Sequence, residues 1–201
     1  MVMDLRETAA VAEVSPKVIR HCLEQEVIKP ARKKGHWRFS EDDALFFALR
    51  DAIPFDIDVK DQRALYTLVV RHKENTSGWK LVDEETLELG TDRLRVSVDF
   101  SRIRRELKRR FDLLAKRETR IVSRMDTLGG EPVFAGTRVA VRHVGLLMLR
   151  GVPMEEMRVD FPRLKEEDFE LAKLLAMIGP KPGRPRRLPP LRFLRDGKEV
   201  K

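Results

Sequence analysis

Apolar residues near the start of the chain recur at helical spacing and predict two short helices joined by a tight connection. The first helix is expected over residues 4–12. The second is expected to begin at Pro16, with Ser15 as its N-cap, and to end near Gln25. Its apolar stripe consists of Val18, Ile19, Cys22 and Leu23.

Polar residues of the second helix fall on the opposite face. Lys17 stands three residues before Arg20 and four before His21, so the three side chains share one side of the helix. Two short helices with a tight turn are typical of a helix-turn-helix, whose second helix fits the major groove of DNA. The alternative interpretation is a structural three-helix domain with a solvated basic face.

A hairpin is predicted after the second helix. Pro30 and Gly35 interrupt the helical pattern, and residues 27–28 are expected to pair with residues 37–39. Trp37 is expected to pack into the core beneath this hairpin. Its tip is expected to consist of Arg32, Lys33 and Lys34. A basic tip of this kind meets phosphate or enters the minor groove.

The positive charge of the chain is concentrated in this region. The net charge is +8, which favours a polyanionic partner where the cations are clustered. Residues 15–39 hold seven Lys or Arg against two Glu, a net charge of +5. The residues expected to contact double-stranded operator DNA are Ser15, Lys17, Arg20, His21, Arg32, Lys33, Lys34, His36 and Arg38.

The segment from Leu5 to about Arg50 resembles the MerR-like winged helix-turn-helix. The matching features are the run VSPKVIRHCLEQEVIKP, the basic turn, and then WRFSEDD, in which Ser40 caps a third helix. Members of this family often carry an aromatic pair directly after the arginine, where this chain has His21 and Cys22. The resemblance implies DNA binding through the second helix and the hairpin, and it leaves the operator sequence open.

Residues 54–118 are predicted to form an α+β connector with a small core of its own. The expected elements are a helix over residues 59–72, strands over 79–82, 86–89 and 94–98, and a helix from Asp99 or Ser101 to about Lys116. The outer face of the last helix carries Arg104, Arg105, Lys108, Arg109 and Arg110. We expect these cations to form a solvated face, with DNA contact as the alternative.

No set of catalytic residues is recognisable in the sequence. The carboxylates are scattered without a His or Cys at metal-ligand spacing, and there is no glycine-rich loop for phosphate. Cys22 is the single cysteine and is expected to be a small buried hydrophobe. We therefore expect no enzymatic activity, no cofactor and no metal. Without a signal-peptide pattern or a bilayer-length apolar run, a cytoplasmic protein with no membrane partner is expected.

Residues 119–178 combine a hairpin pattern with three short helices. Gly129–Gly130 and Gly136 bracket one apolar strand, and Val139–Val141 is predicted as the next. The helices are expected just after that strand, over residues 154–159 and over residues 165–178. This order predicts a homeodomain-like trihelical module with a β-hairpin.

The same segment resembles the bacterial family catalogued as domain of unknown function 433. The pattern G-G-x-P-x-x-x-G-T-R-x-x-V is present as Gly129, Gly130, Pro132, Gly136, Thr137, Arg138 and Val141. Two later motifs comprise Gly151, Glu155 and Glu156, and then Pro162, Leu164, Glu167 and Asp168. The family is associated with antitoxins of PIN-like ribonucleases, and it suggests dimers built through the hairpin. Thr137 and Arg138 are expected to cap the hairpin, with DNA contact as the alternative.

Residues 179–201 form a basic tail. They contain five of the 11 prolines and have a net charge of +6, so an extended segment is expected. The residues expected to bind a toxin are Arg184, Arg186, Arg187, Leu191, Arg192, Phe193, Leu194 and Arg195. An arginine inserted among the carboxylates of a PIN-like nuclease would compete with its metal. The alternatives are a minor-groove contact through residues 182–187, which partly match an AT-hook core, and a tail without a partner.

Taken together, the two motif blocks resemble VapB-type antitoxins. The predicted fold class is α+β, mainly α, with segments over residues 1–53, 54–118, 119–178 and 179–201. The resemblance implies a homodimer that neutralises a PIN-like ribonuclease toxin and represses its own operon by binding operator DNA. The alternative is a MerR-like transcriptional regulator with a ligand-sensing middle domain and no toxin partner.

Overall fold

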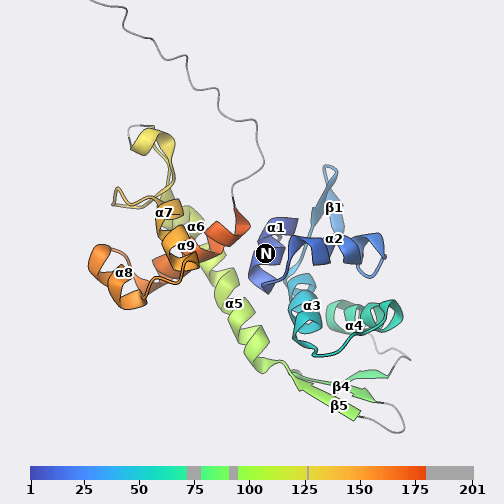
Figure 1. Ribbon diagram of the computed structural model, residues 1–201. Coiled ribbons are helices and arrows are strands. Elements are labelled where there is room, and N and C mark those ends of the chain that lie inside the picture. The colour runs from blue at the N-terminus through green and yellow to red at the C-terminus, as the bar shows by residue number, and fades with distance from the viewer. Residues whose placement is uncertain (72–77, 91–94, 126, 180–201) are drawn as a thin grey trace, which may run out of the picture.

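The computed structural model of this chain describes residues 1–71, 78–90, 95–125 and 127–179. Over these ranges it is an α+β fold dominated by helices, with three small antiparallel sheets, which confirms the predicted class (Figure 1). Among the described residues, no helix combines the length and apolar character needed to cross a bilayer.

The N-terminal block consists of three helices and a hairpin. Their bounds are α1 (Leu5–Ala12), α2 (Pro16–Glu24), β1 (Ala31–Lys33), β2 (His36–Arg38) and α3 (Glu41–Ala52). Capping boxes start two of these helices: the Asp4 carboxylate accepts from the backbone N–H of Glu7, and Ser40 and Asp43 pair in the same way. The predicted helices in this block are therefore confirmed.

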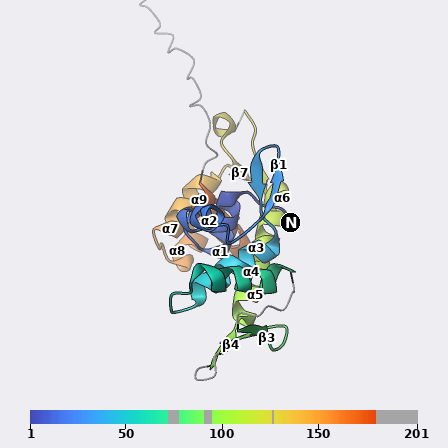
Figure 2. The ribbon, with the colours of Figure 1, turned by 90° about the vertical axis from the view of Figure 1, so that its right-hand side faces the viewer.

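The middle segment is a helix, a three-stranded meander and a long helix. The bounds are α4 (Val59–Arg71), β3 (Trp79–Leu81), β4 (Thr86–Gly90), β5 (Arg95–Asp99) and α5 (Ser101–Ala115). The meander and the β1–β2 hairpin project from opposite ends of the molecule (Figures 1 and 2). These elements match the predicted ones closely.

The C-terminal segment is a short hairpin followed by three helices. The bounds are α6 (Arg117–Arg120), β6 (Ile121–Val122), the 3-10 turn η1 (Leu128–Gly130), β7 (Val133–Phe134), α7 (Val141–Leu149), α8 (Met154–Asp160) and α9 (Glu166–Ile178). The predicted strand at Val139–Val141 is wrong in its extent. Ala140 forms an isolated bridge to Val133, and Val141 already begins α7; the regular partner of β7 is β6.

One apolar core runs through most of the molecule. It contains buried residues of α1, α3, α4 and α5 and extends to Leu171 and Leu174 of α9. The middle segment thus shares the core of the N-terminal block, and the expectation of a separate core was wrong. A second, smaller cluster lies within the C-terminal segment around Phe134, Val144 and Phe169.

Helix α9 is covered on two sides. One side packs against α7, and the other packs against α1 and α5 (Figure 1). Three ion pairs reinforce the second contact or lie beside it: Arg109–Glu170, Lys116–Glu167 and Arg117–Glu7. The C-terminal segment is therefore joined to the N-terminal block by apolar and charged contacts.

Candidate nucleic-acid interface

Helix α2 presents a cationic face to the surface because its apolar residues pack against the core on the opposite side. Ser15 is extended (φ −65°, ψ 138°), and its hydroxyl accepts a hydrogen bond from the backbone N–H of Lys17. Ile19 and Cys22 are fully buried, which fixes the rotation of the helix about its axis. Lys17, Arg20 and His21 are exposed on the opposite face, as predicted.

Two carboxylates lie close to this face along the chain. Glu24, one turn after Arg20 on α2, is exposed, whereas Glu13, at the turn between α1 and α2, lies 2.7 Å from the guanidinium of Arg110. Within the described residues, neither Lys17 nor Arg20 forms an ion pair. Their charges are thus available to a phosphate.

The hairpin differs in register from its prediction. Ala31 pairs with Arg38 and Lys33 with His36, so the strands begin after residues 27–28, which are buried in the core instead. The two-residue turn consists of Lys34 (φ 50°) and Gly35 (φ 78°), which is the backbone pattern of a type I′ turn. Arg32 and Lys33 therefore belong to a strand and not to the tip.

A cross-strand pair orders one of the hairpin cations. Arg32 stands opposite Trp37, and its guanidinium carbon lies 4.1 Å from the centre of the indole ring. Trp37 is half-buried against the main core, as expected, while Arg32 remains exposed. Stacking leaves the edge of the guanidinium free to donate hydrogen bonds.

The base of the hairpin is fixed to the start of the chain. Met3 and Phe39 exchange two backbone hydrogen bonds of 2.9 and 3.0 Å, and both side chains are buried. Of the nine residues predicted to contact DNA, eight are exposed and Arg38 is half-buried. The hairpin and α2 thus present these side chains from a single packed body.

Arg63 holds the far end of α2 and was missed by the sequence reasoning. From α4 it donates to the backbone carbonyl oxygens of Gln25, at 2.6 Å, and Glu26, at 3.2 Å. These carbonyls follow the last turn of α2 and have no partner within the helix. No local signal could have revealed the contact, because it joins positions 37 and 38 residues apart.

The single cysteine of the chain lies in the buried face of α2. Burial raises the pKa of the Cys22 thiol above its ordinary value, and the charge of Arg50 offsets this only in part. A buried thiol with a raised pKa is a poor nucleophile. Over the described ranges, no three His, Cys, Asp or Glu side chains are grouped in a way that could hold a metal ion.

The glycine motif of the C-terminal segment shapes a compact turn. Gly129, Gly130 and Gly136 have φ values of 62°, 87° and 75°, which residues with side chains rarely adopt. The hydroxyl of Thr137 donates to the carbonyl of Phe134 at 2.9 Å and accepts from the N–H of Val139 at 3.1 Å. Thr137 therefore caps the hairpin.

The other residues of that motif have two roles: some hold the turn, and Arg138 lies at the surface. The carbonyl of Pro132 accepts a hydrogen bond of 3.0 Å from the N–H of Val141. The side chain of Arg138 is exposed, and no carboxylate of the described residues pairs with it. Arg138 is thus free to act as a surface cation, whereas its neighbours hold the turn.

The half-exposed Arg120 pairs with the buried carboxylate of Asp168, a contact that the sequence reasoning did not predict. Asp168 is 1% exposed, and both of its oxygens accept from the Arg120 guanidinium, one of them at 2.8 Å from Nε. The same carboxylate accepts from the backbone N–H of Lys165 at 2.8 Å and so caps α9. Asp168 also raises the pKa of Arg120, so this guanidinium stays charged. The pair ties α6 to α9.

The covered position of α9 limits what the C-terminal segment can present to DNA. In a homeodomain-like module the third helix would enter the major groove, but α9 is packed on two sides and begins with Glu166, Glu167 and Asp168. Acidic side chains at that position repel phosphate. The cationic surface at α2 and the hairpin is therefore the better candidate.

Comparisons with known proteins agree with one part of the sequence interpretation. Residues 121–174 match the family described as protein of unknown function (DUF433), so the chain contains a DUF433 domain. An uncharacterized protein, y4eO, of Sinorhizobium fredii is 35% identical over 91 residues. That match covers 45% of this chain and 41% of the relative, so it spans less than half of either protein. No solved structure matches the chain.

The predicted toxin-binding residues lie outside the described residues. They are Arg184, Arg186, Arg187, Leu191, Arg192, Phe193, Leu194 and Arg195. The described part of the chain ends at Gly179, after Ile178 at the end of α9. Met177, near the end of α9, shares a surface hollow with Ala10 and Glu13, so this end of α9 lies close to the turn between α1 and α2.

Proposed function

We propose that this protein binds operator DNA through α2 and the β1–β2 hairpin and serves as the antitoxin of a type II toxin–antitoxin pair. The toxin would be a PIN-like ribonuclease, and DNA binding would repress the operon. One observation carries the DNA part: exposed cations without carboxylate partners stand on a helix and a hairpin that share one core.

In this proposal α2 lies in the major groove as the second helix of a MerR-like winged helix-turn-helix. Lys17 and Arg20 would face the duplex, and the N-terminal end of α2, which begins after the Ser15 cap, would approach the bases. The hairpin is the wing, whose Arg32 and Lys33 reach phosphate or the adjacent minor groove. A homodimer would present two such surfaces to a palindromic operator.

The antitoxin part rests on the DUF433 domain and the basic tail. The domain resembles those of VapB-type antitoxins, and the +6 tail suits the acidic metal site of a PIN-like nuclease. In this proposal the tail neutralises the toxin while the packed body holds the DNA. The hairpin of the DUF433 domain remains the proposed dimer contact.

Operator binding is tested with a fluorescent duplex from the promoter of the protein's own gene. Lys17→Gln and Arg20→Gln should each weaken binding and reduce the slope of log affinity against log salt by about one. Lys80→Gln is the matched control, because Lys80 is exposed on the meander at the opposite end of the molecule. Equal losses in all three variants would refute the assignment of α2.

Toxin binding is tested by co-expression with the product of the adjacent gene. A stable complex is expected, and deletion of residues 179–201 should abolish neutralisation while operator binding persists. Neutralisation by the truncated protein would exclude the tail as the inhibitor. The alternative is a MerR-like regulator with a ligand-sensing middle segment; it would show no complex, and a metabolite would change its DNA affinity.

A further inference from the structure

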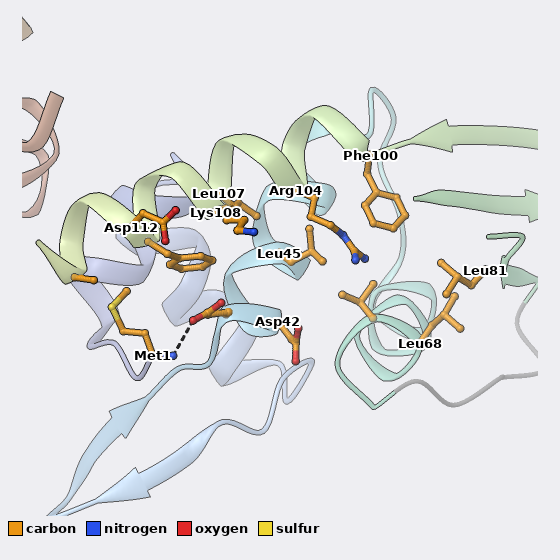
Figure 3. Close-up of a pocket in the computed structure, with 14 residues that line it drawn as sticks. Met1, Asp42, Leu45, Leu68, Leu81, Phe100, Arg104, Leu107, Lys108 and Asp112 are labelled. Carbon is orange, nitrogen blue, oxygen red and sulfur yellow. Dashed lines mark hydrogen bonds and ion pairs between the residues drawn. The ribbon is translucent and has the colours of Figure 1, made fainter. Parts of the chain in front are cut away.

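A groove of about 540 Å³ runs along α5, between this helix and helices α3 and α4 (Figure 3). Its floor is apolar and comes from helices α3, α4 and α5 and from the residue before α5. The buried side chains that form it are Leu45, Leu68, Val69, Phe100, Leu107 and Phe111. Its volume lies within the range of sites for small molecules.

A cation projects into this groove near one end. The side chain of Arg104 extends from α5 toward Leu45 and Leu68, and its guanidinium carbon lies 5.2 Å from the centre of the Phe100 ring (Figure 3). In the described part of the chain no carboxylate pairs with Arg104. Lys108, one turn further along α5, adds a second positive charge at the same wall.

Three acidic residues also line the groove, and among the described residues none of them pairs with Arg104. Asp112 lies two turns away along α5, Glu41 binds the N-terminal amine of Met1 at 2.7 Å, and the exposed Asp42 lies in the first turn of α3 (Figure 3). A negative group would therefore be attracted by Arg104 and Lys108 and repelled by Asp42 and Asp112. The groove thus combines an apolar floor with one anionic subsite.

We propose that this groove binds a small amphipathic monocarboxylic acid, with its carboxylate on the Arg104 guanidinium and its apolar part on the floor. The planar guanidinium matches a carboxylate with two parallel hydrogen bonds, and the Phe100 ring helps to hold it in place. This site goes beyond the proposed function. Its test measures ligand binding directly, so a protein that does not bind DNA can be distinguished from one that does not bind the acid.

The test uses the full-length protein and three eight-carbon probes: octanoate, octanol and octylamine. Isothermal titration calorimetry should detect saturable binding of one octanoate per chain, with the alcohol and the amine at least about tenfold weaker. The same affinity for all three probes would overturn the proposal, as would the absence of saturable octanoate binding.

Two pairs of variants locate the anionic subsite. Arg104→Gln should weaken octanoate about tenfold or more, whereas Arg105→Gln, next to it but not in the groove wall, should not. Leu81 is 43% exposed at the groove, so Leu81→Glu should weaken octanoate while Leu81→Gln should not. Circular dichroism melts check that each variant is folded. The proposal would be overturned if the two arginine variants changed octanoate affinity equally and the two Leu81 variants did so as well.

Other occupants of the groove would give different results. If a second copy covers it, Leu81→Glu should dissociate a dimer in sedimentation experiments, and octanoate should not bind the dimeric protein. If the chain's own tail covers it, octanoate should bind only after residues 179–201 are deleted. Either result would overturn the assignment to a small acid.

Discussion

The backbone of Gly145 in α7 lies directly against the backbone carbonyl of Ala172 in α9. A Cβ atom at Gly145 would overlap that carbonyl oxygen and come within 2.8 Å of the Cβ of Ala176. The missing side chain thus lets the two helices cross closely. Because the other side of α9 packs on α1 and α5, this crossing also positions the DUF433 domain against the N-terminal block.

Substitution of Gly145 should therefore destabilise the whole molecule. Gly145→Val is expected to lower the free energy of unfolding by about 1–3 kcal/mol, because the added atoms must displace backbone. Urea unfolding followed by circular dichroism measures this loss. The control is Leu146→Ala, at a neighbouring side chain that is 39% exposed, with an expected change within about 0.5 kcal/mol. Equal losses would show that α7 and α9 are not tightly packed.

The Arg120–Asp168 pair should contribute more to the free energy of unfolding than the surface pair Lys116–Glu167. Asp168→Asn removes a buried carboxylate from the half-exposed Arg120 guanidinium and from the cap of α9, and it is expected to cost about 2 kcal/mol. Glu167→Gln removes the exposed contact to Lys116 and should cost less than about 1 kcal/mol. Thermal unfolding of both variants gives the comparison. A similar small loss for both would mean that the Arg120 contact is as solvated as the surface pair.

Arg63 should support DNA binding without touching DNA. Arg63→Met removes two hydrogen bonds from the carbonyls after α2, each worth about 1 kcal/mol, and should loosen the end of this helix. Operator affinity is expected to fall while the salt slope stays unchanged, because no phosphate contact is lost. Lys60→Met, an exposed position on the same helix, serves as the control. A reduced salt slope in Arg63→Met would place Arg63 in direct contact with phosphate.

Cys22 should be protected from alkylation in the native state. Its side chain is fully buried, and burial raises the pKa of the thiol, so little thiolate is present or accessible. Iodoacetamide at pH 8 should label the protein slowly in buffer and rapidly in urea, as mass spectrometry would follow. Rapid labelling in buffer would contradict a packed α2 and therefore a fixed cationic face.

The two corrected strands show where pattern reading failed. Residues 27–28 are predicted to form a strand of the hairpin, but Val27 and Ile28 are buried in the main core instead. The real first strand, Ala31–Lys33, is exposed at every position, so it has no alternation that a pattern could reveal. Val139–Val141 has strand-like composition, yet Val141 begins α7 because its side chain packs in the smaller core.

The sequence by itself determined the elements whose causes are local. Ser15, Ser40 and Asp43 start helices through hydrogen bonds within three residues, and the apolar spacing sets which face of α2 is buried. The DUF433 motif is equally local. These signals act within one or two helical turns, so they can be recognised from the sequence without a structure.

Only the tertiary structure decided which distant residues meet. Arg63 reaches the end of α2, Asp168 meets Arg120 across 48 residues, and α9 is covered by α1. The groove beside Arg104 likewise exists only where α3, α4 and α5 converge. Such contacts depend on how buried apolar faces orient whole helices, and side chains far apart in the chain meet only once that packing is complete.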